Sequence, residues 1–335
     1  EMSASLVGSE MCIRDRNEGK SMGMIIEKYI GKFGRKIFLL FCWLFTLIVI
    51  AAFADMVAGT FNAYTVVDGA SQLAPAASTN GSAGTVSIMF MVFAVVFGLI
   101  QKKLNLSGWK EAVVGIAFIV ASFVIGNFCP IILGKNAWSY ITFVYIFFAA
   151  VMPMWLMKQP RDYMTTFMFI AMIVGAALGL VVAHPSMNLP VYTGFNNAKL
   201  GTMFPILFVT VACGAVSGFH SLVSSGTSSK TVENEKDMLK VGYGAMVLES
   251  LLAVLALCVA GAAAAADGTA AAGTPFQIFS RGVAGFFEMF GVPVHFATVF
   301  MTMCVSALAL TSLDAVARIG RMSFQELFSV DDMEH

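Results

Sequence analysis

Residues 37–60 read IFLLFCWLFTLIVIAAFADMVAGT and contain a single charged residue, Asp55. A helix needs about 20 mostly apolar residues to cross about 30 Å of hydrocarbon, and this stretch meets that requirement. Along the rest of the chain, seven more stretches come close to it. The sequence therefore predicts an all-α polytopic membrane protein with eight spans, at about residues 37–60, 84–101, 111–128, 138–157, 163–183, 204–225, 241–265 and 294–313.

The composition of the whole chain agrees with a membrane protein. Of 335 residues, 58% are apolar and 12% are charged, whereas soluble domains have about 45–50% apolar and about 25% charged residues. A water-soluble core is therefore excluded. The net charge is zero, with 20 basic and 20 acidic residues, so no overall attraction to nucleic acid is expected. The six cysteines form no CxxC pair, and they indicate neither a disulfide framework nor a metal site.

The basic residues between the predicted spans alternate in number. Segments expected on one side hold 15 lysine and arginine residues, and the opposite segments hold only three, Lys135, Lys199 and Arg281. Cytoplasmic loops carry the excess of basic residues, so both ends of this chain are predicted to lie in the cytoplasm.

Two outer segments have distinct compositions. Residues 62–83 are rich in Ala, Ser and Gly and contain no basic residue, so we expect a solvated loop. In residues 274–291 the phenylalanines recur at helical spacing. This second pattern predicts a short helix at the outer interface, with a re-entrant segment as the alternative.

The first sixteen residues, EMSASLVGSEMCIRDR, look like a translated sequencing adapter rather than evolved protein. We exclude residues 1–16 from the fold, together with their two arginines. The remaining sequence, 17–330, is expected to form one transmembrane domain that is truncated at both ends.

The sixth span carries the strongest indication of a binding site. It reads FPILFVTVACGAVSGFHSLVSSGTSSK from Phe204 to Lys230, and its apolar character stops at Ser217 and Gly218. Irregular backbone at membrane depth is tolerated where it lines a cavity, and broken helices of this kind form substrate sites in secondary transporters. The alternative is structural, because glycines also allow close helix packing and serines can bond back to the helix.

Three ionisable side chains within or beside the spans are candidates for moving a proton. His220 could carry a proton or donate to a carboxylate, or be a neutral ring bonded to a backbone carbonyl. Glu249 lies about 12 Å into the seventh span at ~1.5 Å per residue, which indicates a proton relay or a structural hydrogen bond. Asp314 has Arg318 four residues on, and we interpret these two as an ordinary ion pair on the helix surface.

Two further charged positions receive structural interpretations. Arg161 and Asp162 follow Pro160 at the cytoplasmic start of the fifth span. The Asp162 carboxylate is favourable at the positive N-terminus of a helix, and the Arg161 charge agrees with the excess of basic residues in cytoplasmic segments. This interpretation is favoured over a salt bridge between the two residues that acts as a gate. Asp55 lies near the outer end of the first span, where it can reach headgroup water.

Several of these stretches resemble the carbon starvation protein A (CstA) family of peptide and pyruvate carriers. They are MWLMKQPRDYMTTF from Met154, TMFPILFVTVACGAVSGFHSLVSSGTSSK from Thr202, VGYGAMVLESLLAVLALC from Val241 and, more loosely, ALTSLDAVARIGRMSFQELF from Ala309. The resemblance implies a long protein of the bacterial inner membrane, with further spans before and after this chain. It also implies a distant relation to the amino-acid/polyamine/organocation transporters, whose inverted repeats place two broken helices face to face. The break near 214–227 would then form one half of a site.

The resemblance further implies uptake of peptides or pyruvate during carbon or nutrient starvation, coupled to protons, with sodium left open. The implied partners are that small molecule, the coupling ion and the lipid bilayer, without nucleic acid or cofactor. Ser229 stands where the family often has Pro. The residues at the family's motif positions are candidates for substrate binding, namely Gly214, Ser217, Gly218, Phe219, His220, Ser224, Ser225, Gly226 and Thr227, and for proton coupling, namely His220, Glu249 and Asp314.

Two other classes of function compete with a secondary active transporter. An intramembrane hydrolase would need Ser224 or Ser225 activated by His220, but the sequence has no GxSxG elbow, no HExxH pair and no third orienting residue nearby. A membrane-embedded nutrient sensor would need a signalling domain, which these residues do not contain. A GxxxxGK[ST] phosphate loop is also absent from the sequence. The sequence therefore favours a transporter over an enzyme.

Overall fold

The computed structural model describes residues 17, 20–67, 70–104, 108–153, 155–190, 192, 194–197, 201–215, 222–223, 234–264, 271 and 273–328. Contacts within the chain divide it into two compact units. Unit 1 comprises residues 1–47, 189–254 and 318–335, and unit 2 comprises residues 48–188 and 255–317.

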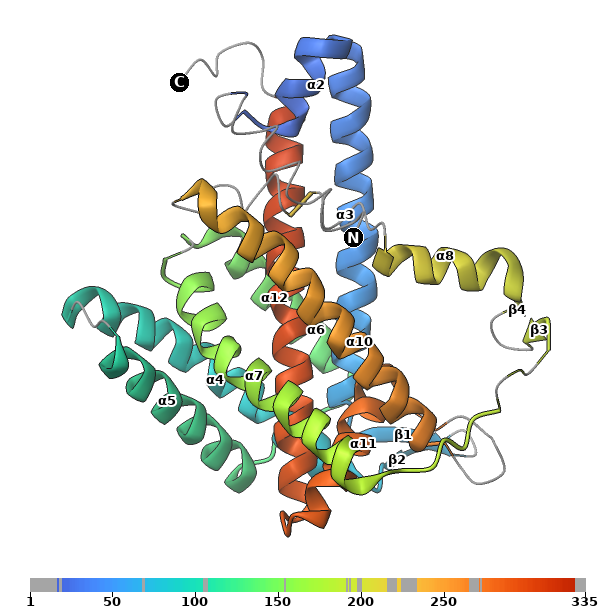
Figure 1. Ribbon diagram of the computed structural model, residues 1–335. Helices are drawn as coiled ribbons and strands as arrows, with labels where there is room; N and C mark the ends of the chain where they lie inside the picture. The colour runs from blue at the N-terminus through green and yellow to red at the C-terminus, as the bar shows by residue number, and fades with distance from the viewer. Residues whose placement is uncertain are drawn as a thin grey trace. The chain divides into compact units, whose positions relative to one another are not determined.

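Six helices within the described residues are long and apolar enough to cross a membrane (Figure 1). They are α3 (Lys32–Phe61), α4 (Ala77–Leu104), α5 (Trp109–Phe128), α7 (Lys158–Ala183), the π-helical turn η3 (Lys240–Gly244) continuing into α10 (Ala245–Ala262), and α12 (Val294–Phe328). Each corresponds to a predicted span, and the prediction of an all-α polytopic membrane protein is confirmed.

The other two predicted spans are shorter helices in the structure. α6 (Lys135–Val151) has 17 residues and α8 (Met203–Ala215) has 13. The predicted end of the fourth span at 157 is wrong, because Met152 is extended and Pro153 follows it, and a residue before proline is disfavoured in the α conformation. The predicted break near 214–227 lies mostly outside the described residues.

The predicted solvated loop at 62–83 is partly wrong. It contains an antiparallel hairpin of β1 (Tyr64–Val67) and β2 (Ala70–Leu73), and its last residues belong to α4, whose first turns are largely buried. A Cβ atom added to Gly81 would stand 3.0 Å from the Ile131 carbonyl oxygen. The small residues that suggested solvent therefore serve close packing, a use that composition alone does not distinguish.

Unit 1 contains a short helix, α2 (Met22–Ile30), that the sequence analysis does not predict. Ser21 caps it by accepting from the Met24 amide at 3.3 Å, and the same hydroxyl donates to Glu326 Oε2 at 2.9 Å. Arg35 bonds Glu27 at 2.6 Å and the Glu326 carbonyl oxygen at 3.0 Å. α2, the start of α3 and the end of α12 are thereby joined. The small elements β3 (Asn196–Asn197), β4 (Gly201–Thr202) and η2 (Glu235–Asp237) complete the described part of this unit.

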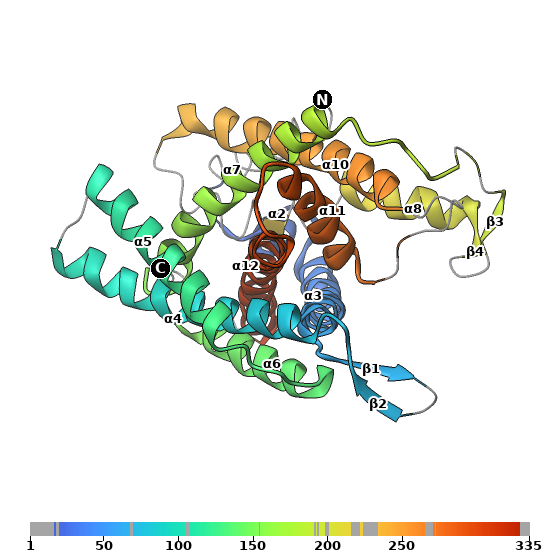
Figure 2. The same ribbon diagram turned by 90° about the horizontal axis from the view of Figure 1, so that it is seen from below.

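Unit 2 is built around α4 and α5, which lie side by side as an antiparallel pair (Figure 1 and Figure 2). α7 packs against both of them. One face of α7 carries Met164, Met168 and Met172, each at most 2% exposed. The Cys304 thiol of α12 donates a long hydrogen bond to the Met168 carbonyl oxygen, at 3.8 Å. A methionine face of α7 is thus part of the interior of unit 2.

α11 (Pro275–Met289) confirms the short helix predicted at 274–291. Thr274 and Gln277 form a capping box, in which each side chain satisfies a backbone N–H of the other residue. Gln277 also donates to the Thr60 carbonyl oxygen at the end of α3, at 3.2 Å. Gly179 of α7 lies against the Phe286 side chain, so α11 packs closely on α7.

Candidate functional site

The first turn of α7 is buried, including the side chains of Lys158 and Arg161. α4 packs against it at Gly98, where an added Cβ atom would stand 2.7 Å from Pro160 Cγ and 2.9 Å from the Leu156 carbonyl oxygen. Both distances are shorter than ordinary van der Waals contacts. The glycine therefore allows α4 to hold the first turn of α7 in position.

Arg161 forms the centre of a buried polar group in unit 2. Its Nη1 atom makes an ion pair with Asp314 Oδ2 of α12 and donates to the Tyr145 hydroxyl of α6. Its Nη2 atom lies 3.2 Å from Asp162 Oδ1 and 3.2 Å from Thr311 Oγ1. The side chains of Arg161 and Asp314 are each 1% exposed. Three helices, α6, α7 and α12, thus meet at one guanidinium group.

The charges in this group do not balance. One guanidinium faces two carboxylates, Asp314 and Asp162, and only Asp162 reaches solvent, with a side chain that is 35% exposed. When all three groups are ionised, the net charge is one negative charge. Because uncompensated buried charge is costly, a single proton on the group would remove the imbalance.

The buried pair also retains unused bonding capacity. Among the described residues, neither Arg161 Nε nor Asp314 Oδ1 has a hydrogen-bond partner. Most buried polar groups are paired, and an unpaired one costs about 1–3 kcal/mol. Arg161 Nε can therefore donate to a ligand, and Asp314 Oδ1 can bind a proton or accept from a ligand, without displacing an existing hydrogen bond.

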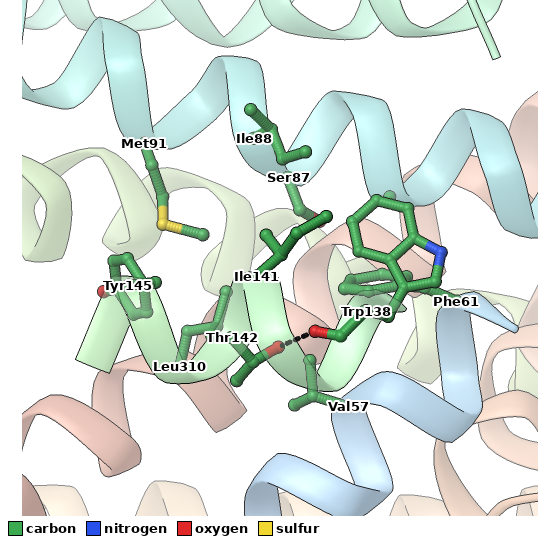
Figure 3. A pocket seen from close by; sticks show the side chains of 11 residues that line it. Val57, Phe61, Ser87, Ile88, Met91, Trp138, Ile141, Thr142, Tyr145 and Leu310 are labelled. Carbon is green, nitrogen blue, oxygen red and sulfur yellow. Dashed lines mark hydrogen bonds between the residues drawn. The ribbon is translucent and has the colours of Figure 1, made fainter. Parts of the chain in front are cut away.

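A small cavity of about 20 Å³ adjoins the pair at Tyr145, between α3, α4, α6 and α12 (Figure 3). Figure 3 shows Met91 and Tyr145 at one end of it and Trp138 and Phe61 at the other. The Thr142 hydroxyl in its wall donates to the Trp138 carbonyl oxygen at 2.8 Å. The wall residues are mostly apolar, with hydroxyl groups from Ser87, Thr142 and Tyr145 and the indole N–H of Trp138, and the cavity is large enough for about one water molecule.

The structure corrects two interpretations made from the sequence. Asp314 is buried and pairs with Arg161, so it is not one half of an ordinary surface pair with Arg318. Arg161 lies in the first turn of α7, as expected for the start of the fifth span, but its side chain is buried instead of lying at the cytoplasmic surface. It forms a salt bridge with Asp162 at 3.2 Å, and it also pairs with Asp314 of α12, a partner that the sequence does not predict.

The other predicted site residues lie in unit 1, outside the described residues, or at an exposed position of unit 2. Glu249 lies on α10 in unit 1 with an exposed side chain, and Gly214 lies in α8. Ser217, Gly218, Phe219, His220, Ser224, Ser225, Gly226 and Thr227 lie outside the described residues. Asp55 pairs with Lys135 at 2.7 Å, and both side chains are substantially exposed.

The sequence does not predict that Tyr145 and Thr311 belong to this group, or that Arg161 is the partner of Asp314. Neither Tyr145 nor Thr311 has a distinctive sequence context, since hydroxyl side chains are common in spans. For the ion pair, a signal was available: Arg161 and Asp314 are opposite charges placed near the same predicted membrane face. Intramembrane charges usually pair with one another, so the two could have been matched.

Comparison with known proteins finds one matching family and several related transporters. The family model described as carbon starvation protein CstA matches residues 9–267 and 260–333. The pyruvate/proton symporter BtsT of Escherichia coli (strain K12) is 35% identical over 264 residues, which cover 74% of this chain and 34% of the symporter.

Two peptide transporters named CstA are similarly related. That of Escherichia coli (strain K12) is 32% identical over 261 residues, covering 73% of this chain and 34% of the relative. That of Bacillus subtilis (strain 168) is 31% identical over 280 residues, covering 70% and 46%. The chain thus spans about a third of the length of the two Escherichia coli relatives. No solved structure matches significantly.

Proposed function

Because the chain belongs to the carbon starvation protein CstA family, we propose that it acts in a secondary active transporter that takes up peptides or pyruvate together with protons. One relative is named a pyruvate/proton symporter and another a peptide transporter. The proposed place of action is the bacterial inner membrane during carbon or nutrient starvation, with both ends of this chain in the cytoplasm. The proposal includes no enzymatic step.

The observation that carries this function is the buried pair of Arg161 and Asp314. Ionisable side chains within membrane spans are costly and mark ion or substrate pathways. Here the group has one excess negative charge and an unpaired oxygen on Asp314. We assign Asp314 as a proton-binding residue, whose loading changes the bond that links α7 to α12.

The remaining candidates keep the roles that the family resemblance implies. The segment from Gly214 to Thr227 is proposed to contribute to substrate binding, with His220 and Glu249 as further proton-coupling residues. A ligand shifts a conformational equilibrium only by its differential affinity for the two states. Protonation of Asp314 supplies such a difference, because it weakens the ion pair with Arg161. A conformation without this ion pair is therefore favoured when the proton is bound.

Uptake by cells that produce the full-length gene product tests this function. Labelled pyruvate and a labelled dipeptide are offered with and without a protonophore, and with sodium replaced by choline. We expect uptake of at least one substrate to fall to background with the protonophore and to persist without sodium. Uptake that depends on sodium and ignores the protonophore would replace the proton with sodium as the coupling ion, and absence of uptake for both substrates would refute the function.

The Asp314→Asn variant tests the assigned proton site. We expect it to abolish accumulation against a gradient, because asparagine is isosteric but carries neither charge nor a titratable proton. Removing one member of a buried ion pair also lowers stability, so accumulation is scaled to the amount of folded protein in the membrane. Asp55→Asn is the matched control, since it removes the carboxylate of an exposed pair in the same unit. Equal, protonophore-sensitive accumulation by both variants would contradict the role of Asp314, and His220→Ala and Glu249→Gln would then be the next variants to assay.

A further inference from the structure

We propose that Arg161 binds the carboxylate group of the transported substrate, which replaces Asp314 as the partner of the guanidinium. The inference rests on the proposed transport function and deepens it, because it assigns a binding residue and the chemical group of the substrate that the residue recognises. In the described structure Arg161 is paired with Asp314, and the proposed exchange opens this ion pair.

The chemistry of the group fits a carboxylate ligand. A guanidinium presents a planar set of N–H donors that matches a carboxylate with two parallel hydrogen bonds. Pyruvate and peptides, the substrates for which two relatives are named, differ in size and composition but share a carboxylate. Arg161 Nε has no partner among the described residues, so an incoming carboxylate can form its first bond before Asp314 leaves.

One proton keeps the net charge of the buried group constant during this exchange. In the unloaded group, Arg161 carries one positive charge and Asp314 and Asp162 carry two negative charges. In the loaded group, the proton lies on Asp314 and the substrate carboxylate takes over its negative charge. The net charge of the buried group is the same before and after, because the proton offsets the negative charge that the substrate carboxylate brings.

Besides Arg161, the first turn of α7 carries a second buried basic side chain, Lys158. Tyr145 of α6 is a neutral hydroxyl at the ion pair, and Thr311 of α12 is another. α4 contributes the small residue Gly98 to the packing around the first turn of α7. Along α12, Arg318 lies one turn beyond Asp314 in the sequence. Asp314 is therefore the buried carboxylate with which a substrate must compete.

An apolar cavity beside Tyr145 adjoins the proposed carboxylate site. Its wall combines apolar side chains with hydroxyl groups, and its end at Tyr145 abuts the ion pair. At about 20 Å³ it is too small for pyruvate, so loading must enlarge it. Met91 lies at the same end (Figure 3), and an unbranched thioether side chain can change rotamer to admit a ligand.

Equilibrium binding to the purified full-length protein tests the proposal without requiring transport. Labelled pyruvate is displaced by unlabelled pyruvate or by pyruvamide, which replaces the carboxylate with a neutral amide, and a dipeptide is compared with its C-terminal amide. We expect Asp314→Asn to keep the preference for the carboxylate form. Adding Arg161→Gln to Asp314→Asn should lower that preference by roughly 10- to 100-fold, the loss expected for a hydrogen-bonded charge pair. Folding of both variants is checked by thermal melting, and the exposed pair variant Asp55→Asn with Lys135→Gln serves as the control.

The outcomes separate this inference from the proposed function. An unchanged carboxylate preference in the folded double variant overturns the role of Arg161, even if the wild-type protein transports both substrates. Failure of the wild-type protein to bind either substrate at millimolar concentration overturns it as well. Conversely, a preference that depends on Arg161 in a protein without measurable uptake would support the binding site and refute the transport function.

Discussion

At the scale of single residues, burial decides what the charged side chains do. The sequence identifies Asp314 as an ionisable residue in a span, but it pairs it with its neighbour in the chain rather than with Arg161. Sequence spacing reveals partners on the same helix, whereas a partner on another helix depends on how the two helices pack. Tyr145 completes the group from a third helix, and no local pattern marks it.

The energetic role of the pair can be separated from its functional role. Arg161→Gln leaves the Asp314 carboxylate buried without its partner, and removing one member of a buried pair costs about 3–5 kcal/mol. We expect a large loss of folded protein in the membrane, measured by fluorescence-detected chromatography and thermal melting. The double variant Arg161→Met with Asp314→Leu removes both charges and should restore the amount of protein but not substrate accumulation. Normal accumulation by the double variant would show that the pair has only a structural role.

At the scale of secondary structure elements, the sequence predicts where helices lie better than where they end. Seven predicted spans coincide with helices over most of their length, and the sixth does so over 204–215, because long apolar stretches leave few alternatives. The end of α6 is misplaced because hydropathy continues past Pro153 while the backbone does not. The start of α4 is missed because its buried residues are small and polar rather than apolar.

Close packing between α4 and the start of α7 gives a prediction at this scale. Gly98→Ala would place a methyl group 2.7 Å from Pro160 Cγ and 2.9 Å from the Leu156 carbonyl oxygen, and a crowded site of this kind typically costs about 1–3 kcal/mol. We expect a lower melting temperature and weaker uptake, because the first turn of α7 carries Arg161. Gly285→Ala in α11 is the control, since no atom lies within 4 Å of the added Cβ and alanine favours a helix by about 1 kcal/mol. Equal melting temperatures for the two variants would contradict the packing argument.

At the scale of the whole molecule, the alternation of basic residues predicts the direction of every span. The prediction is testable with single cysteines and a maleimide that does not cross membranes. In a background without the natural cysteines, Gln72→Cys in β2 should react in intact cells, and Lys103→Cys in the last turn of α4 should react only after permeabilisation. Both positions are exposed in the structure. The reverse pattern would invert the predicted topology and place Arg161 near the outer surface.

The methionine face of α7 has a consequence for how fast such a protein could work. A helix that is held by branched side chains must break interlocking contacts before it moves, whereas unbranched thioethers can rearrange around a moving neighbour. Met164, Met168 and Met172 follow Arg161 along the buried face of α7, so this contact surface is deformable where the ion pair would change. Replacing all three with leucine preserves the apolar character of the face but stiffens it. The change should therefore slow each transport cycle more than it weakens substrate binding.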